Sequence, residues 1–292
     1  MDFSRQSATS TFLVDNGSLQ PESVLRLRQT AWRLSQRVGV RIEPVSMLHS
    51  SGIDPAKLDN VPAEILEPAI RRRVRSGVRD IQVVPLFFGP SAALIEYIPQ
   101  RTARIAAEFP DLRVVMAGPL VDVSDSDDRL ARALSDRVLE AMSAAGAKNP
   151  RVILVDHGSP RPEVAAVRDH VAGQLAQVLG SRVGSVRAAS MERRPGEEYA
   201  FNEPLLENAL LDALHAQPSC PVIVSLMFFA PGRHAGPGGD IEQICRRCTE
   251  QDSRFRIHIA GVLGDHPALI EILADRYQTV TEQAERSRQT ND

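Results

Sequence analysis

Three side chains with metal-binding chemistry stand just after short apolar runs in the second half of the chain. His157 follows the run Arg151–Asp156, Glu192 follows Val183–Ala189, and His234 follows Val222–Phe228. Imidazole nitrogen suits Co²⁺, Ni²⁺, Fe²⁺ and Zn²⁺, and a carboxylate adds negative charge. Three protein ligands leave coordination positions open for exchange. We therefore predict that His157, Glu192 and His234 bind a divalent metal and that they act in catalysis, since histidine also accepts protons.

Each of these residues also has a simpler interpretation. A histidine at a strand end is often a hydrogen-bonding loop residue, and the run Glu192-Arg-Arg194 could be a solvated loop. His49 also lies close to an apolar run and is a further candidate for the same cleft. His170 and His215 fall on helical segments, where we expect them to be surface or packing residues.

The sequence contains an internal duplication, whose two copies are offset by about 140 residues. Four pairs of segments recur in the same order: Phe12–Ser18 with Ile153–Ser159, Val83–Phe88 with Val222–Phe229, Leu112–Leu120 with Phe255–Leu263, and Leu134–Arg137 with Leu273–Arg276. A repeat of this kind predicts two copies of one structural unit.

The two copies differ at the metal-binding positions. Where the second copy has His157, Glu192 and His234, the first has Asn16, Leu48 and Ala93. Ligands of parallel α/β sheets gather at the carboxyl ends of the strands. This asymmetry separates scaffold from site, and it places the predicted site in the second copy.

Each copy alternates apolar runs with helical segments, which predicts parallel sheets covered by helices on both faces. The predicted strands are Thr11–Asp15, Val40–Ser46, Ile81–Phe87, Leu112–Met116, Arg151–Asp156, Val183–Ala189, Val222–Phe228 and Arg256–Ala260. The predicted helices include Glu22–Val38, Ala63–Ser76, Asp128–Ala144, Glu163–Leu179, Leu205–His215, Ile241–Thr249 and Pro267–Arg286. With the polar stretch Ala144–Asn149 as the joint, we predict an N-terminal lobe at residues 1–147 and a C-terminal lobe at 148–292.

Composition excludes several classes of protein. The 292 residues are 43% apolar and carry a net charge of −3, unlike the strongly basic nucleic-acid binders. No apolar run reaches the length of a membrane span, and the first ten residues lack the apolar core of a signal peptide, so we expect a cytoplasmic protein. Of the three cysteines, Cys245 and Cys248 form a Cys-x-x-Cys on a helical segment. We interpret them as buried helical thiols, although a redox or metal pair is an alternative.

The second half resembles the class II tetrapyrrole chelatases, the sirohydrochlorin cobaltochelatases and ferrochelatases. The residues that carry the resemblance are Leu154–Ser159, Ser190-Met-Glu192, Leu226–His234 followed by Asp240-Ile241, and Gly261–Leu269. The first half matches as scaffold. The chain departs from the family pattern in having five residues, Ala235–Gly239, between the second histidine and the aspartate where three are usual.

The resemblance implies two tandem flavodoxin-like, chelatase-like lobes that insert Co²⁺, Fe²⁺ or Ni²⁺ into sirohydrochlorin or a similar tetrapyrrole, in cobalamin or siroheme biosynthesis. The metal is then a substrate, and no organic cofactor is expected. The ring would lie in the cleft between lobes, so a monomer would suffice. We expect arginines to bind its acidic side chains; the candidates are Arg161, Arg193, Arg194 and Arg233. The glycines of Gly236–Gly239 suggest a lid.

Three other functions remain open on the residues alone. A metal or tetrapyrrole carrier would use the same ligands without turnover. A metal-dependent hydrolase would use the same His/Glu set on esters or phosphates. A nucleotide-binding loop at Gly232–Gly239 follows a strand but fits neither G-x-G-x-x-G nor the P-loop pattern.

Overall fold

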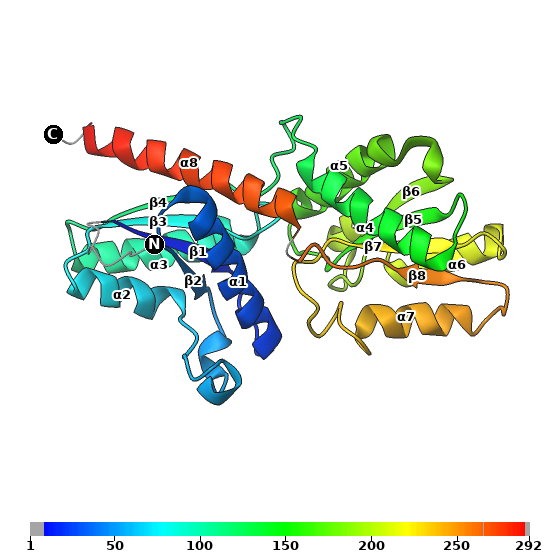
Figure 1. Cartoon of the computed structure of the whole chain (residues 1–292), viewed down its shortest axis with the longest axis horizontal. Helices are drawn as coiled ribbons and strands as arrows, with labels where there is room; N and C mark the ends of the chain where they lie inside the picture. Colours follow the sequence, from blue (N-terminus) through cyan, green and yellow to red (C-terminus); the bar gives the residue numbers. More distant parts are fainter. Residues whose placement is uncertain (1–8, 265, 290–292) are drawn as a thin grey trace. The chain divides into compact units, whose positions relative to one another are not determined.

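The computed structural model describes residues 9–264 and 266–289, and this part of the chain forms two four-stranded parallel sheets (Figure 1). The first sheet has the order β2-β1-β3-β4 and the second β6-β5-β7-β8. The strands are β1 (Thr9–Asp15), β2 (Ile42–Ser46), β3 (Asp80–Pro85), β4 (Arg113–Met116), β5 (Arg151–Asp156), β6 (Ser185–Ser190), β7 (Val222–Leu226) and β8 (Ile257–Ile259). The identical orders confirm a duplicated α/β fold, and the predicted strand limits agree with the observed ones to within two residues.

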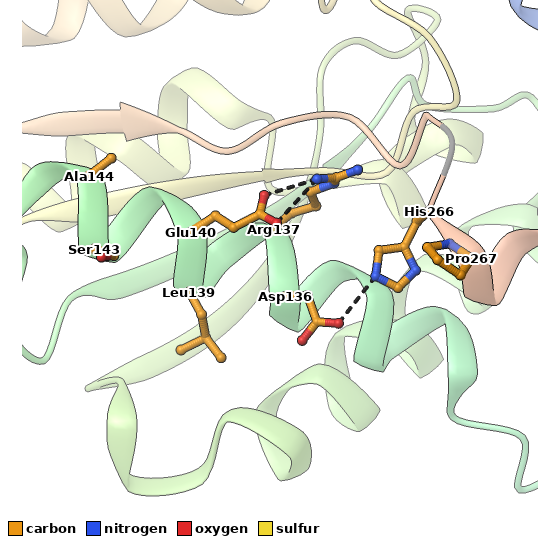
Figure 2. A pocket seen from close by; sticks show the side chains of 8 residues that line it. All are labelled: Asp136, Arg137, Leu139, Glu140, Ser143, Ala144, His266 and Pro267. Carbon is orange, nitrogen blue, oxygen red and sulfur yellow. Dashed lines mark hydrogen bonds and ion pairs between the residues drawn. The ribbon is translucent and has the colours of Figure 1, made fainter.

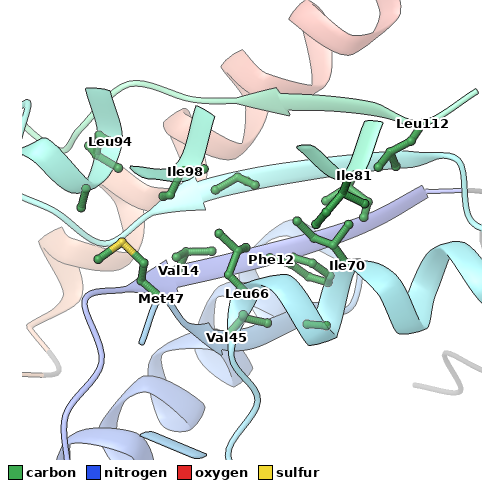
Figure 3. Packing of buried hydrophobic residues seen from close by; sticks show 14 of the residues in the cluster. Phe12, Val14, Val45, Met47, Leu66, Ile70, Ile81, Leu94, Ile98 and Leu112 are labelled. Atoms are coloured by element: carbon green, nitrogen blue, oxygen red, sulfur yellow. The ribbon is translucent and has the colours of Figure 1, made fainter. Parts of the chain in front are cut away.

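The apolar runs form strands because both faces of each sheet are covered. Phe12, Leu13 and Val14 of β1 are completely buried, and so are Val222, Ile223 and Val224 of β7. In the first sheet, Phe12 and Val14 pack against Leu66 and Ile70 on one face (Figure 3). Continuous apolar runs of this kind are typical of parallel strands that are buried on both sides.

Eight α-helices flank the sheets in the described part of the chain. They are α1 (Pro21–Val38), α2 (Leu66–Arg75), α3 (Ile98–Glu108), α4 (Arg129–Ala145), α5 (Pro162–Leu179), α6 (Leu206–Ala216), α7 (Asp240–Thr249) and α8 (Pro267–Gln289). Helix α3 was not among the predicted segments: it continues from a π-helical turn at Ala93–Tyr97 and has Pro99 in its first turn, which obscures a regular helical pattern. No helix within the described ranges combines the length and apolarity that a membrane crossing requires.

Two compact units are defined by their internal contacts, and they do not coincide with the sequence repeats. The first unit joins Asp122 and the described residues before it to the residues from Ile270 onward, and the second unit is Val123–Leu269. In the second unit, α4 packs on α5, β7 and β8. In the first unit, Arg276 of α8 donates hydrogen bonds to the carbonyl oxygens of Pro119 (2.7 Å) and Leu120 (3.0 Å). The helix that ends each repeat therefore packs in the unit built mainly by the other repeat. The lobe limits at 1–147 and 148–292 stay a prediction about the repeated sequence.

Candidate metal and tetrapyrrole site

The second sheet brings the three predicted ligands together at the carboxyl ends of β5, β6 and β7. Asp156 at the end of β5 pairs with Ser190 at the end of β6, so the residues that follow them lie side by side. The rings of His157 and His234 have their centroids 4.7 Å apart, with their planes at 74°. His157 Nε2 lies 3.5 Å from Glu192 Oε1. Parallel strand order alone accounts for this convergence, as the sequence predicted.

A glycine allows the loops that carry His157 and Glu192 to touch. Gly158 has φ = +92°, and a Cβ placed there would lie 1.9 Å from the carbonyl oxygen of Glu192. The Glu192 N–H donates to His157 O over 3.3 Å, and the Met191 N–H donates to Asp156 O over 2.8 Å. Glycine alone tolerates both the left-handed backbone and the close approach, so this position sets the spacing between imidazole and carboxylate.

His234 is oriented by Asp240, the first residue of α7. His234 Nδ1 donates a hydrogen bond to Asp240 Oδ2 over 2.5 Å, and the Ile241 N–H donates to His234 O over 3.1 Å. A carboxylate that accepts from Nδ1 fixes the tautomer and leaves the lone pair of Nε2 available to a metal ion. The five-residue spacing between His234 and Asp240 therefore still produces a close contact.

The intervening glycines pack closely rather than forming an open loop. A Cβ at Gly236 would lie 2.6 Å from Gly232 O, and one at Gly239 would lie 2.6 Å from Arg233 O. The Gly238 N–H donates to Glu242 Oε2 over 2.7 Å. The glycines thus let the chain turn tightly around His234, and the role of Gly236–Gly239 as a lid stays a prediction.

A pocket of about 430 Å³ opens over the three predicted ligands. Its lining residues are His157, Met191, Glu192, Arg233, His234, Asp240, Gln243, Ile244 and Arg247. The side chains of His157 and Glu192 are 49% and 61% exposed, and that of His234 is 28% exposed. The donor atoms are therefore accessible to a bulky substrate as well as to a hydrated ion.

Within the described residues, no three His, Cys, Asp or Glu side chains stand as a ready-made group for one metal ion. The side chains of His157 and Glu192 contact each other, and His234 contacts Asp240. The three predicted ligands are therefore adjacent and accessible, and each of them contacts a neighbouring side chain.

The four predicted substrate arginines have different surroundings. Arg233 lines the pocket, and its Nε lies 3.9 Å from Asp240 Oδ2. Arg193 donates from Nε to Glu203 (2.7 Å) and from Nη1 to the carbonyl oxygen of Gly196 (2.7 Å) within its own loop. Arg194 lies over the ring of Tyr199 at 5.9 Å, and Arg161 pairs with Glu163 at 3.4 Å.

Helix α7 contributes pocket residues that were not among the predicted site residues. Asp240, Gln243, Ile244 and Arg247 all line the pocket. Their spacing of three and four residues places them on one helical face. That spacing is visible in the sequence, but only the fold shows which face of the helix meets the histidines.

Beneath the ligands lies a buried carboxyl group, Asp156. It accepts hydrogen bonds from Ser190 Oγ (2.6 Å) and from the Gly158 N–H (3.1 Å). Burial raises the pKa of Asp156, while the Ser190 hydrogen bond and the Arg168 charge oppose that rise. Asp156 thus ties the His157 loop to the end of β6.

The first sheet repeats this backbone without the ligands. Gly17 has φ = +86°, and a Cβ there would lie 1.8 Å from Leu48 O, as Gly158 does with Glu192. Asn16 and Leu48 occupy the positions of His157 and Glu192. His49 is exposed with φ = +65° in the loop after β2, and its contribution to the site stays a prediction. The structural match confirms that these loops are scaffold common to both repeats.

A larger hollow of about 950 Å³ lies elsewhere on the second unit, between α4 and the segment before α8 (Figure 2). Its polar side chains contact one another: His266 Nε2 lies 3.2 Å from Asp136 Oδ2, and Arg137 pairs with Glu140 at 3.0 Å. The strand ends that carry His157, Glu192 and His234 do not border it. This hollow is therefore a different surface feature from the candidate site.

Three solved structures share this fold over nearly the whole chain. SirB from Bacillus subtilis with Fe³⁺ has a TM-score of 0.70 and 18% identity, covering 95% of this chain and 97% of that one. The sirohydrochlorin chelatase SirB from Bacillus subtilis subspecies spizizenii in complex with cobalt has a TM-score of 0.65 and 18% identity, covering 95% of each chain. CbiX, described as the terminal enzyme for biosynthesis of siroheme in denitrifying bacteria, has a TM-score of 0.57 and 16% identity, covering 92% of this chain and 98% of that one.

One family model matches most of the sequence. No curated protein matches the chain significantly. The CbiX family model matches twice, at residues 10–141 and again at residues 151–280, once for each repeat. This double match confirms the resemblance to class II tetrapyrrole chelatases, and the chain belongs to the CbiX family.

Proposed function

We propose that the chain inserts a divalent metal, Co²⁺ or Fe²⁺, into sirohydrochlorin or a similar tetrapyrrole, as a chelatase of cobalamin or siroheme biosynthesis. The observation that carries the proposal is the convergence of His157, Glu192 and His234 in one open pocket, on a backbone whose sister copy lacks all three. The fold shared with SirB structures containing Fe³⁺ and cobalt supports it.

In the proposed reaction the metal is a substrate that the protein holds loosely. Nε2 of His234, oriented by Asp240, and an imidazole nitrogen of His157 supply two ligands, and Glu192 supplies a carboxylate after its contact with His157 opens. Three protein ligands leave coordination positions for water and then for the ring nitrogens. A loosely held ion can leave for the ring, which a closed structural site would prevent.

Proton release balances the metal insertion. The ring loses two pyrrole N–H protons as it gains M²⁺, so two protons must reach solvent. His157 and Glu192 leave the metal as it enters the ring and are then free to accept protons. Since both are about half exposed, water can carry those protons away.

Arginines at the pocket would bind the carboxylates of the tetrapyrrole. Arg233 and Arg247 line the pocket itself, and Nε of Arg247 lies 3.2 Å from Glu207, which leaves its terminal amino groups for a ligand. Arg161, Arg193 and Arg194 remain candidates for more distant carboxylates. Charge-assisted pairs between guanidinium and carboxylate would orient the ring without taking part in the chemistry. The remaining parts of the proposal are a cytoplasmic location, no organic cofactor and function as a monomer.

An anaerobic absorbance assay tests the proposal. Purified protein is mixed with sirohydrochlorin and, separately, with Co²⁺, Fe²⁺ and Ni²⁺, beside the His157→Ala variant and the matched Asn16→Ala variant of the sister loop. We expect insertion above the spontaneous rate for the wild type and Asn16→Ala, and loss of at least 100-fold for His157→Ala, which corresponds to about 2.7 kcal/mol. Equal rates with and without wild-type protein would overturn the proposal.

The same assay separates the two other functions that use these ligands. A carrier would release metal to the ring once per protein molecule, so product would stop at one equivalent. A hydrolase would leave the tetrapyrrole spectrum unchanged and would act on ester or phosphate substrates.

A further inference from the structure

The largest fully buried side chain of the described residues is an arginine, Arg168 of α5, which is 1% exposed. Taking a guanidinium out of water costs several kcal/mol unless hydrogen bonds replace those to water. An arginine in such a place indicates a network that uses its donors, and Arg168 lies directly behind the loops that carry His157 and Glu192.

Arg168 joins three segments of the second unit. Its Nη1 donates to Ser190 Oγ at the end of β6 (2.5 Å) and to Asn202 O (3.1 Å), and its Nη2 donates to Phe201 O (3.2 Å). Nε donates to Asp169 Oδ1 over 2.8 Å. The planar fork of arginine suits this task, since its donors point in fixed and different directions.

Two of these partners, Ser190 and Asn202, also form hydrogen bonds to the loop that carries His157. Ser190 Oγ in turn donates to Asp156 Oδ1 over 2.6 Å, and Asp156 is the residue before His157. The Asn202 side chain holds the His157 loop at Ser159. Its Oδ1 accepts from the Ser159 N–H and its Nδ2 donates to Ser159 O, both over 2.9 Å. Ser190 is also two residues before Glu192. Both loops therefore depend on one guanidinium.

The sister repeat builds the same turn without an arginine. At the position of Arg168 it has Leu27, which is 3% exposed. In the first repeat Ser50 makes the contact that Asn202 makes in the second. Its Oγ accepts from the Ser18 N–H over 3.1 Å and lies 2.9 Å from Ser46 Oγ. A buried leucine is thus sufficient for the fold, and the arginine occurs in the repeat that carries the metal-binding side chains.

We propose that Arg168 is a positioning residue that holds the His157 and Glu192 loops at the separation needed for metal binding. The inference rests on the proposed function in taking a divalent metal as the ligand. Without the guanidinium, the Ser190 hydroxyl loses a donor, and the carbonyl oxygens of Phe201 and Asn202 lose theirs. The two loops are then free to separate, although the fold itself persists.

The test compares Arg168→Leu, which installs the sister residue, with Arg168→Lys, which keeps the charge without the fork. Arg73→Leu is the matched control, because Arg73 forms a partly buried ion pair with Glu43 in the other unit. Amide hydrogen exchange at Met191 and Glu192 reports the joint between the loops without any metal. Titration with Co²⁺ alone reports metal affinity.

We expect Arg168→Leu to speed exchange at Met191 and Glu192 and to weaken Co²⁺ binding by at least tenfold each. Arg168→Lys should show intermediate effects, and it also serves if the leucine variant does not fold. Arg73→Leu should change neither. Unchanged exchange in Arg168→Leu or Arg168→Lys would overturn the positioning role, and faster exchange with unchanged Co²⁺ affinity would overturn its link to the metal. Faster exchange in the Arg168 variants, combined with a wild-type protein that shows no chelatase activity, would instead refute the proposed function and leave the positioning role intact.

Discussion

Single side chains distinguish the two repeats at the candidate site, because the backbone around them is the same. Gly17 and Gly158 both have left-handed φ angles, and each lies against the second residue after the neighbouring strand. Asn16 cannot replace an imidazole as a metal ligand of comparable strength, and Leu48 offers no donor atom. The proposed metal chemistry is therefore available to the second repeat and not to the first, although the two share one fold.

Asp240→Asn should weaken the binding of Co²⁺ by about 10- to 100-fold, as loss of a carboxylate behind a histidine ligand generally does. The amide cannot match the charged acceptor that holds His234 Nδ1–H. Isothermal titration of the wild type, Asp240→Asn and the exposed control Glu250→Gln with Co²⁺ measures the effect. An affinity within twofold of the wild type would show that Asp240 does not orient His234 for a metal.

Asp15 makes the stability of the first unit depend on pH. Burial raises its pKa from 3.8 to about 6, while Ser46 and Gly17 hydrogen bonds oppose the rise. Because the folded state holds this proton more tightly, the stabilisation is complete below about pH 4 and is lost as the pH rises through 6. Two pKa units correspond to about 3 kcal/mol. The wild type loses this stabilisation between pH 4 and pH 8, whereas Asp15→Asn has no carboxyl group to ionise there. The free energy of unfolding of Asp15→Asn, minus that of the wild type, should therefore increase by about 3 kcal/mol over this range.

Urea unfolding at pH 4, 6 and 8 measures this gain, with the exposed Asp111→Asn as control. A difference between the Asp15→Asn variant and the wild type that does not change with pH would contradict the prediction.

At the scale of elements, helix α7 serves the core on one face and the pocket on the other. Ile241, Cys245 and Cys248 are buried, which confirms the interpretation of the cysteines as buried helical thiols. Burial, with smaller contributions from Cys248 and Glu242, raises the pKa of Cys245 to about 12. That thiol stays protonated at neutral pH, so it is unsuited to redox exchange or metal binding. The opposite face carries Asp240 and Arg247 to the pocket.

Arg247→Ala should raise the KM for the tetrapyrrole by about tenfold with little change in kcat. The loss of one charge-assisted hydrogen bond costs about 1.5 kcal/mol or more and affects binding of the substrate rather than the metal transfer. The adjacent Arg246→Ala is the matched control, because Arg246 is exposed and does not line the pocket. Steady-state assays at saturating Co²⁺ check this, and equal KM values for both variants would exclude Arg247 from substrate binding.

At the scale of the whole molecule, the helices that end the two repeats are exchanged between the compact units. Helix α4 buries Leu130, Leu134 and Val138 in the unit that contains the candidate site, and α8 buries Leu273 and Val280 in the other. The sequence repeat and the packing unit are consequently different pieces of chain. A fragment cut at the repeat boundary separates a helix from the sheet that it covers.

A fragment of residues 123–269 should fold and bind Co²⁺, whereas a fragment of residues 148–269 should not fold stably. The shorter fragment lacks α4. Burial of each large apolar side chain of that helix contributes about 1.5–3 kcal/mol to the free energy of unfolding. Three such losses approach the whole stability of a typical domain. Circular dichroism and thermal unfolding of both fragments measure the difference, and equal stability would show that α4 is dispensable.

Much of this protein follows from local patterns in the sequence. The eight strands were predictable because buried parallel strands are continuous apolar runs, and the repeated segments predicted two sheets of one topology. The convergence of His157, Glu192 and His234 was predictable from strand ends alone. Helix α3 was missed, since Pro99 and the π-helical turn disturb its periodicity.

The duplicated α/β architecture, the family and the set of three adjacent side chains were all predictable from the amino-acid sequence, because each depends on short motifs or on one rule of sheet geometry. The contacts made around that set became visible in the folded protein alone. These are the Asp240–His234 hydrogen bond, the pocket position of Arg247, the Arg168 network and the exchange of α4 and α8. Such contacts depend on how whole elements pack, and a linear pattern carries no record of which neighbour a helix face will meet.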